Sequence, residues 1–300
     1  MIQRIQLLIF CLVVVVAAHG QEKKKRIPNA YHKKKQEKKD DEKFLEKQWW
    51  LGFKAGANLS NIRVDKTYSV VSPTNYDASS IAKKGYNNFD LWGSQATIEI
   101  SFYFKRFLLS FQPTYQHIQF QYSNKFEWNG STEQATNHVE LSYKQLQKVD
   151  YAIFPLIVKY DVYGHRLRPY VQAGIYSAMR LSANKEVSAS GIDNAAGGNN
   201  QFHTETVSVG ADDLFAKYHW GVMGGVGVNY NLGNHVRLNL DVMYKYGMSN
   251  ITSTEHRYSS DRLAGVGDAM DDMKLDNLFI SLGCLFPLRF LQSTLQTLDK

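Results

Sequence analysis

The sequence predicts an all-β fold, an eight-stranded antiparallel up-and-down transmembrane β-barrel. Three observations predict it. Apolar and polar residues alternate along eight segments, the connections between these segments are in turn long and short, and an export signal precedes all of them. The chain of 300 residues is long enough for one or two domains, and a single barrel over residues 49–290 accounts for most of it.

Residues 1–20 have the pattern of a cleaved signal peptide. Arg4 supplies a positive charge, residues 7–18 are apolar, and Ala18-His19-Gly20 places small residues before a cleavage point. The apolar run is too short to span a bilayer as a helix, although an uncleaved anchor is the alternative. Because Cys11 would leave with this peptide, only Cys284 would remain, and the mature chain could form no internal disulfide.

A charged segment over residues 21–48 is predicted to form a periplasmic tail, either disordered or helical. It carries most of the net charge of +7, so the rest of the chain is nearly neutral and no nucleic-acid partner is expected. The tail would either contact anionic lipid or an acidic partner, or act as a solvated spacer. Its candidate contact residues are Lys23, Lys24, Lys25, Arg26, Lys33, Lys34 and Lys35.

Period-2 alternation is clearest in residues 236–248. Every even position from Val236 to Met248 is apolar or aromatic, whereas most odd positions are polar. Each alternating segment is at least about as long as the ~9–11 residues that a tilted membrane strand requires. The predicted strands are residues 49–59, 94–104, 107–120, 148–162, 168–183, 215–232, 236–250 and 277–290.

The connections between these strands differ systematically in length. Long polar loops alternate with tight turns, which is typical of outer-membrane barrels with long external loops and short periplasmic turns. The pattern puts both chain ends on the periplasmic side, including an extension over residues 291–300. The predicted turns are 105–106, 163–167 and 233–235, and the predicted loops are 61–93, 121–147, 184–214 and 251–276.

A soluble β-sandwich would also show alternation, and three facts weigh against it. The segments are long for sandwich strands, whose usual length is ~5–6 residues. The chain carries an export signal. Aromatic residues recur at the strand ends, where interfacial girdles would lie, namely at Trp49, Phe104, Phe107, Tyr160, Tyr163, Tyr170, Tyr230 and Phe290.

Several of the strands also carry a family resemblance. Residues 50–60 (WLGFKAGANLS) contain a G-x-K-x-G-x-N pattern, residues 149–160 read VDYAIFPLIVKY, and residues 168–174 read RPYVQAG. With the glycine-rich 221–229 and the Y-x-Y-G of 244–247, these motifs resemble the PorT-like outer-membrane β-barrels of Bacteroidetes. The resemblance covers residues 49–290 and implies an eight-stranded barrel in the outer membrane. It also suggests a link to type IX protein secretion.

Charged residues are expected on the inward faces of the strands. An eight-stranded barrel is just wide enough to be filled by its side chains, so these charges are predicted to pair and close the lumen. A narrow polar channel is the alternative. The predicted lumen residues are Lys54, Glu99, Lys159, Arg180, Lys217, Arg237, Asp241, Lys245 and Arg289.

No catalytic, cofactor or metal site is expected. His219 and Asp241 would lie on neighbouring strands and could act on lipid or peptide bonds, but no G-x-S-x-G elbow accompanies them, and a hydrogen-bonded lumen histidine is favoured. Asp268, Asp271 and Asp272 lack the spacing of an EF-hand loop, so a solvated acidic loop is expected.

These observations predict a monomeric outer-membrane protein without enzymatic activity, acting as a structural or interaction component of secretion or surface assembly. Its expected partners are outer-membrane lipid and a periplasmic or surface protein. The alternative is a small-solute pore or a lumen-based lipid-modifying enzyme.

Overall fold

The computed structural model describes residues 47–69, 84–104, 106–129, 138–162, 166–194, 200–232, 236–258 and 268–288. The predicted signal peptide, the basic residues of the tail, Arg289, Phe290 and the C-terminal extension lie outside these residues. Within the described part of the chain, no helix has the length and apolar character needed to cross a membrane.

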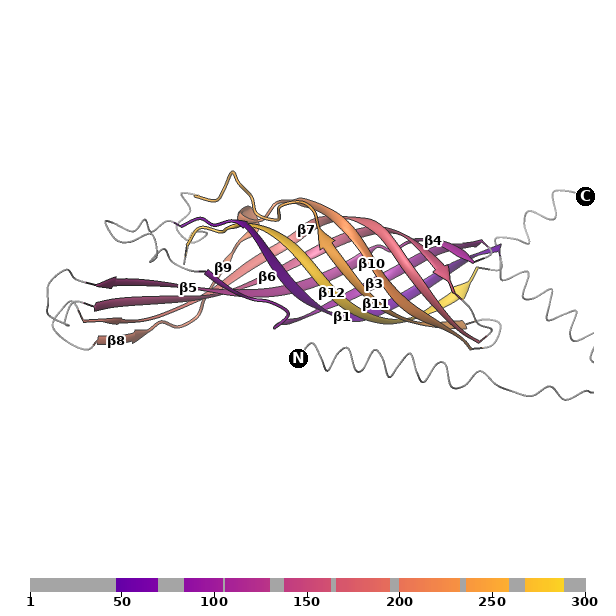
Figure 1. Ribbon diagram of the computed structural model, residues 1–300, viewed down its shortest axis with the longest axis horizontal. Coiled ribbons are helices and arrows are strands. Elements are labelled where there is room, and N and C mark those ends of the chain that lie inside the picture. The colour runs from indigo at the N-terminus through magenta and orange to yellow at the C-terminus, as the bar shows by residue number, and fades with distance from the viewer. Residues whose placement is uncertain are drawn as a thin grey trace, which may run out of the picture. The chain divides into compact units, whose positions relative to one another are not determined.

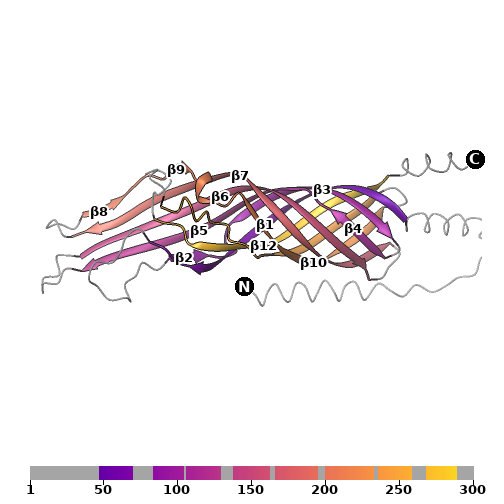
Figure 2. The same cartoon turned by 90° about the horizontal axis from the view of Figure 1, so that it is seen from above.

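The central feature is a closed ring of eight antiparallel strands (Figures 1 and 2). Each strand pairs with the next, and the last pairs with the first, so the ring has no open edge. The predicted fold class is therefore confirmed. The ring consists of β1 (Lys47–Lys66), β3 (Trp92–Phe104), β4 (Phe107–Phe111) with β5 (Thr114–Asn129), β6 (His138–Asp161), β7 (Leu167–Asp193), β10 (Tyr218–Leu232), β11 (Val236–Gly247) and β12 (Asp272–Pro287).

Burial follows the sequence alternation. In β3 every second residue is buried, and the intervening residues face outward and are exposed, as Ile98 and Ile100 are, or half-buried, as Phe102 is. Large apolar side chains are exposed in this way around the whole ring, which defines an outward apolar belt. Aromatic pairs lie near the short-turn end, where the rings of Trp49 and Phe102 are 5.1 Å apart and those of Phe107 and Tyr160 are 5.0 Å apart. This is the surface that a bilayer covers.

Three strands continue well past the belt at the end opposite the short turns (Figures 1 and 2). The strands β6 and β7 have 24 and 27 residues, and β5 extends beside β6 to Asn129. Short strands flank them, namely β2 (Lys84–Asn87), β8 (Asn200–His203) and β9 (Val207–Gly210), followed by a 3-10 helix, η2 (Asp212–Leu214). We call the part formed by residues 119–129, 138–150 and 182–193 with β2, β8 and β9 the extended sheet.

The extended sheet corrects the predicted loops. Much of 121–147 and 184–214, predicted as loop, is strand, and β1 likewise continues to Lys66 inside the predicted loop 61–93. The cause is physical. Above the belt the outward face of a strand meets water and its apolar residues face inward, as Phe120, Tyr122 and Phe126 of β5 do. These strands therefore lack the outward apolar face that marks a membrane strand, although the backbone pairing continues.

Two irregularities interrupt the barrel wall. The predicted strand 107–120 is divided into β4 and β5 at Gln112 and Pro113, because proline has no N–H for the strand ladder. In β7 a β-bulge leaves Leu181 opposite no residue of β6. The bulge reverses which residues of β7 face inward, from even positions such as Ala178 to odd positions such as Ala183.

Candidate functional site

The lumen contains a buried charge network centred on Glu99. The Lys54 ammonium nitrogen lies 2.5 Å from Glu99 Oε2, and that of Lys159 lies 2.7 Å from Oε1. Lys54 also pairs with Asp241. The four side chains come from β1, β3, β6 and β11 and are nearly inaccessible to water. The network therefore ties distant parts of the wall together across the lumen.

Asp241 has further neutral partners. Its carboxylate accepts hydrogen bonds from the Tyr170 hydroxyl and, at 2.9 Å, from Gln172 Nε2. Gly227 faces the same spot. A Cβ atom there would lie 2.3 Å from the Tyr170 oxygen and 2.6 Å from Asp241 Oδ1. A glycine is thus required on β10 so that tyrosine and aspartate can meet.

A second polar group lies around Lys245. The Lys245 ammonium donates to Gln116, whose amide donates to Asn277 Oδ1 at 2.8 Å. Asn277 in turn donates to Asn58 Oδ1 at 3.1 Å. The amides of this group connect β1, β5 and β12, and Lys245 adds β11, so the lumen is crosslinked by neutral groups as well as by charges.

Arg237 is held mainly by aromatic rings near the short-turn end. Its guanidinium lies 4.2 Å from the ring centroid of Trp50 and 5.5 Å from that of Tyr103. Its Nε donates to Asn231 Oδ1 at 2.9 Å. Stacking over electron-rich ring faces stabilises a buried cation without a carboxylate.

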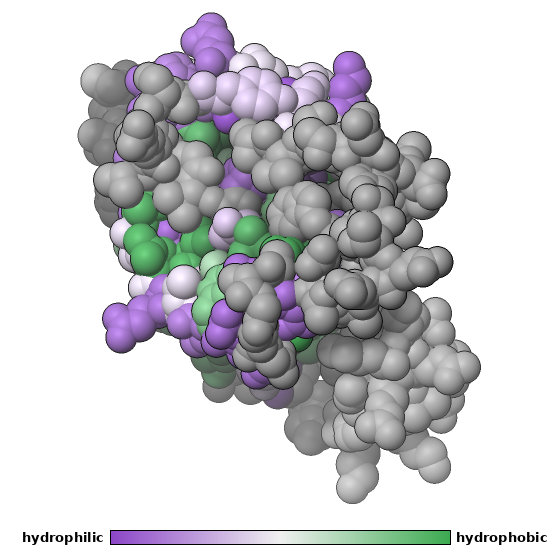
Figure 3. Space-filling model, turned by 90° about the vertical axis from the view of Figure 1, so that its left-hand side faces the viewer, coloured by the Kyte–Doolittle hydropathy of each residue, from purple (hydrophilic) through white to green (hydrophobic). Residues whose placement is uncertain are grey.

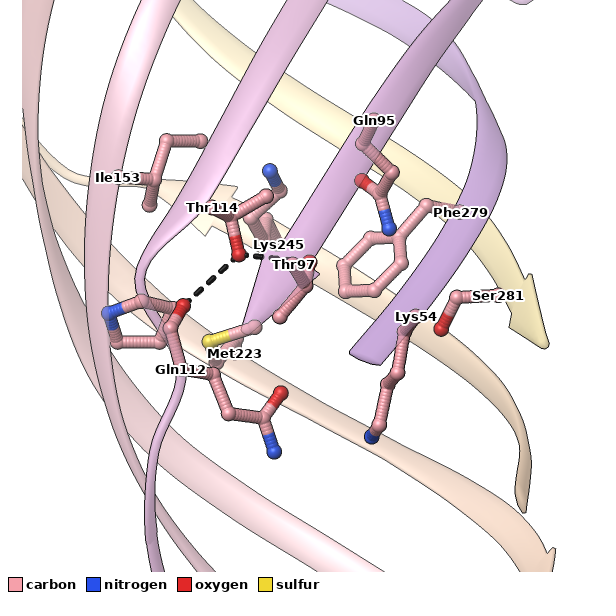
Figure 4. Close-up of a pocket in the computed structure, with 11 residues that line it drawn as sticks. Lys54, Gln95, Thr97, Gln112, Thr114, Ile153, Met223, Lys245, Phe279 and Ser281 are labelled. Atoms are coloured by element: carbon pink, nitrogen blue, oxygen red, sulfur yellow. Dashed lines mark hydrogen bonds between the residues drawn. The ribbon is translucent and has the colours of Figure 1, made fainter. Parts of the chain in front are cut away.

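The space left in the described lumen is small. A cavity between Lys54, Gln112, Met223 and Lys245 has room for about one water molecule (Figure 4). On its wall the Thr97 and Thr114 hydroxyls lie 2.8 Å apart in a hydrogen bond. At this level of the barrel the described side chains therefore leave little free space.

The predicted lumen residues fall into three groups. Lys54, Glu99, Lys159, Arg237, Asp241 and Lys245 face inward and are buried. Arg180 directly precedes the β7 bulge, on the same parity as the inward Ala178, and its side chain is 15% exposed and pairs with Asp212 at 3.2 Å at the upper end of the lumen. Lys217 is a correction, because it precedes β10 and is exposed. Arg289 lies outside the described residues.

Sequence reasoning named only the charged residues of the lumen. It missed neutral members such as Asn58, Gln116 and Tyr170. Their positions on the inward side of alternating segments were an available signal, because a closed lumen must satisfy its buried charges with hydrogen bonds.

His219 and Asp241 do not form a catalytic pair. The His219 ring packs edge-on against the rings of Tyr151 and Tyr176, with centroids 4.6 and 6.0 Å away. His219 lies opposite Ala178 in the ladder, far along β10 from Gly227, the partner of Asp241. The histidine is a packed interior residue.

Above the belt, Lys84 joins two segments that are distant in sequence. Its ammonium nitrogen lies 2.9 Å from Asp271 and 3.4 Å from Asp268, and it donates to the Ala269 carbonyl at 2.5 Å. The Tyr86 hydroxyl donates to Asp271 at 2.6 Å, and burial together with Asp271 raises the pKa of this tyrosine. The predicted solvated acidic loop is therefore wrong for Asp268 and Asp271, which are buried and paired with Lys84.

Lys185 lies close to this cluster. Its side chain is 0% exposed, and within the described residues its ammonium nitrogen has no hydrogen-bond partner. Burial lowers the pKa of Lys185 to about 8, against the raising effect of Asp268. Figure 3 looks onto this end of the molecule and shows hydrophobic residues gathered between hydrophilic ones.

A polar cluster marks the upper limit of the belt on the outside of the wall. Asp150 accepts hydrogen bonds from Tyr115 at 2.9 Å and from Ser182 at 2.8 Å. The His117 Nδ1 atom lies 2.7 Å from the same carboxylate. These side chains come from β5, β6 and β7 and are partly exposed, so they present one polar surface where the apolar belt ends.

The closed antiparallel ring, its apolar outer face and its filled polar interior define an outer-membrane β-barrel protein. Residues 33–253 match the family model described as outer membrane protein beta-barrel domain, and the chain belongs to this family. It is a protein of the outer membrane. Because short turns face the periplasm in such barrels, we infer that the extended sheet is extracellular.

Several solved structures are similar to the chain at low sequence identity. The attachment invasion locus protein Ail of Yersinia pestis is 11% identical, with a TM-score of 0.29, and the match covers 80% of this chain and 99% of that one. Outer Membrane Protein W of E. coli is 16% identical, with a TM-score of 0.32 and 81% and 98% covered. The outer membrane protease OmpT from Escherichia coli is 10% identical, with a TM-score of 0.32 and 80% and 97% covered. No curated protein matches the sequence.

Proposed function

We propose that this protein is a monomeric, non-enzymatic interaction component of the outer membrane that binds a protein partner through its extended sheet. The observation that carries the proposal is strand length. Tilted membrane strands need only ~9–11 residues, whereas β6 has 24 and β7 has 27. More than half of each strand is therefore not needed to cross the membrane.

The interior supports the same proposal. A pore would need the Lys54–Glu99–Lys159 network to separate, and uncompensated charges in a barrel of this width cost several kcal/mol each, on the order of 3–5. A lumen enzyme would need an accessible reactive group, and the described charged groups of the lumen are paired or packed. The external surface is the better candidate for function.

The edge of the extended sheet offers a mode of binding. Among the described residues, β8 pairs only with β7, and its four residues are all exposed, with Phe202 42% exposed. The Thr204 N–H donates to the Ala189 carbonyl at 2.8 Å, so the antiparallel alternation directs the His203 N–H to the open edge. A strand of a partner can add to such an edge.

A backbone substitution tests this mode of binding. We expect His203→Pro to abolish recovery of the crosslinked partner from intact cells, because proline removes the outward N–H and leaves the bonds to β7 in place. His203→Ala, which keeps the N–H, should recover the partner as wild type does. The measurement is crosslinking on the cell surface followed by purification of the barrel and mass spectrometry.

The proposal is overturned if both variants recover the same partner as wild type, or if removal of residues 190–204 leaves recovery unchanged. Assembly of each variant is checked by its heat-modifiable migration on a gel. If the crosslinked protein is a second copy of this chain, the proposed binding to a different protein is wrong and the exposed edges of two copies pair with each other.

We further propose, from the sequence resemblance, that the protein is one of the PorT-like barrels and takes part in type IX protein secretion. This proposal is supported if a strain lacking this protein loses secreted proteins from the medium and regains them with the wild-type chain. Unchanged secretion in this strain would overturn the proposed role in type IX secretion and would not affect the proposal that the extended sheet binds a partner.

A further inference from the structure

A groove lies on the outside of the barrel wall where β4 ends and β5 begins. Its volume is about 570 Å³, which is in the range of small-molecule sites. The rim carries large outward side chains, and the floor carries small ones. The rim residues are Phe53, Ile98, Tyr115, Phe154 and Leu181, and the floor includes Ala96, Pro113 and Ala152.

The groove follows from the irregularities of the wall. Pro113, between β4 and β5, and Pro155, on the neighbouring strand β6, both lack the N–H that a regular ladder would use. Two backbone hydrogen bonds complete the ladder here. The Gln112 N–H donates to the Pro155 carbonyl at 3.1 Å, and the Ile98 N–H donates to the Pro113 carbonyl at 3.0 Å. The β7 bulge adds Leu181 to the rim. The recess is therefore built into the backbone.

The wall is thin at this point. Lys54, Thr97 and Thr114 border both the groove and the small lumen cavity. Figure 4 shows Thr97 and Thr114 joined by a hydrogen bond, with Thr114 also donating to the Gln112 carbonyl at 2.8 Å. The threonine hydroxyls are satisfied by these contacts. The groove therefore presents an apolar recess toward the bilayer and not a polar passage.

The two ends of the groove differ in chemistry. Tyr115 belongs to its rim and also donates to Asp150. Through Tyr115 the recess is continuous with the polar cluster of His117, Asp150 and Ser182 at the limit of the belt. An apolar trough that ends at a polar cluster matches a molecule with a hydrocarbon chain and a polar head group.

We propose that this groove binds one acyl chain of a membrane phospholipid, with the head group beside His117 and Asp150. We infer a lipid as the occupant because the groove is continuous with the apolar belt. The rim residues Phe53, Ile98 and Phe154 belong to the belt, which contacts lipid. An acyl chain held in the groove differs from bulk lipid because protein side chains of the rim and of the floor surround it on three sides. The proposal does not depend on the function of the extended sheet.

Photolabelling tests the proposal on the full-length protein in vesicles. The probe is a phosphatidylethanolamine with a diazirine on one acyl chain, diluted into phosphatidylcholine, and labelled residues are located by mass spectrometry. We expect labelling to concentrate on Ile98 and Phe154 and to saturate as the probe fraction rises. Ala152→Trp fills the floor of the groove and should abolish this labelling. Ala173→Trp, on an outward alanine of β7 away from the groove, should not.

Labelling spread evenly over belt residues such as Val226 and Leu240, or labelling at Ile98 and Phe154 that survives Ala152→Trp, would overturn the proposal. Heat-modifiable migration shows whether each variant is assembled. If Ala152→Trp does not assemble, Ala96→Phe fills the same floor from β3 and replaces it, with the same two outcomes.

Discussion

Glu99→Gln is expected to lower the free energy of unfolding by about 3–5 kcal/mol. Glu99 is fully buried and bridges two lysines, with Lys54 2.5 Å and Lys159 2.7 Å from its oxygens. The amide removes the negative charge and leaves both ammonium groups in a lumen that water barely enters. Urea titration of folding into lipid bilayers, followed by gel mobility, measures the loss.

The matched control is the same substitution on the surface. Glu127 pairs with Lys125 at 2.7 Å, but the two side chains are 46% and 50% exposed. Exposed pairs contribute little, so Glu127→Gln should leave the urea midpoint unchanged. A Glu99→Gln protein that unfolds at the same urea concentration as wild type would show that the lumen is hydrated enough to tolerate the loss of the Glu99 charge.

Lys84→Met is expected to release the segment around Asp268 and Asp271 from the extended sheet without unfolding the barrel. In the wild-type protein Lys84 neutralises the carboxylates of Asp268 and Asp271. In the variant both carboxylates would stay buried without this cation, at a cost on the order of 3–5 kcal/mol. The membrane ladders do not involve Lys84, so the change is local. Hydrogen exchange should become faster in β2 and in residues 268–272 and stay unchanged in β10 and β11.

Lys274→Met is the control for this prediction. Lys274 pairs with Asp65 at 2.8 Å in a more exposed setting, with side chains 29% and 46% exposed. Its loss should alter exchange little in either region. Exchange in β2 that is equally slow in Lys84→Met and in wild type would mean that Lys84 does not hold the two segments together.

The membrane part of the fold could be predicted because the bilayer imposes a pattern on it. A strand with lipid on one side and a polar lumen on the other must alternate, so residues 236–248 identified β11 almost exactly where it lies. The division of 107–120 was also within reach, since Pro113 interrupts that segment. Six of the charged lumen residues followed from the same inward parity.

The remaining features depend on contacts between distant parts of the chain, which the sequence alone does not reveal. The bulge at Leu181 reverses the inward face of β7 from even positions such as Ala178 to odd positions such as Ala183, and the alternation of the sequence does not show where this reversal occurs. In the extended sheet the apolar residues, such as those of β5, face inward and the outward residues are polar, so its strands lack the outward apolar face of a membrane strand. The pairing of Lys84 with Asp268 joins residues from two predicted loops, and only the folded chain brings them together.

We propose that the barrel is closed and that its function lies on its external surface. Single-channel recording of the purified protein in a planar bilayer tests this claim most directly. We predict that the wild-type protein inserts without unitary current steps, because paired and packed side chains fill the lumen between Lys54 and Lys245. Reproducible steps that scale with the number of inserted barrels would contradict the account and assign the protein a pore.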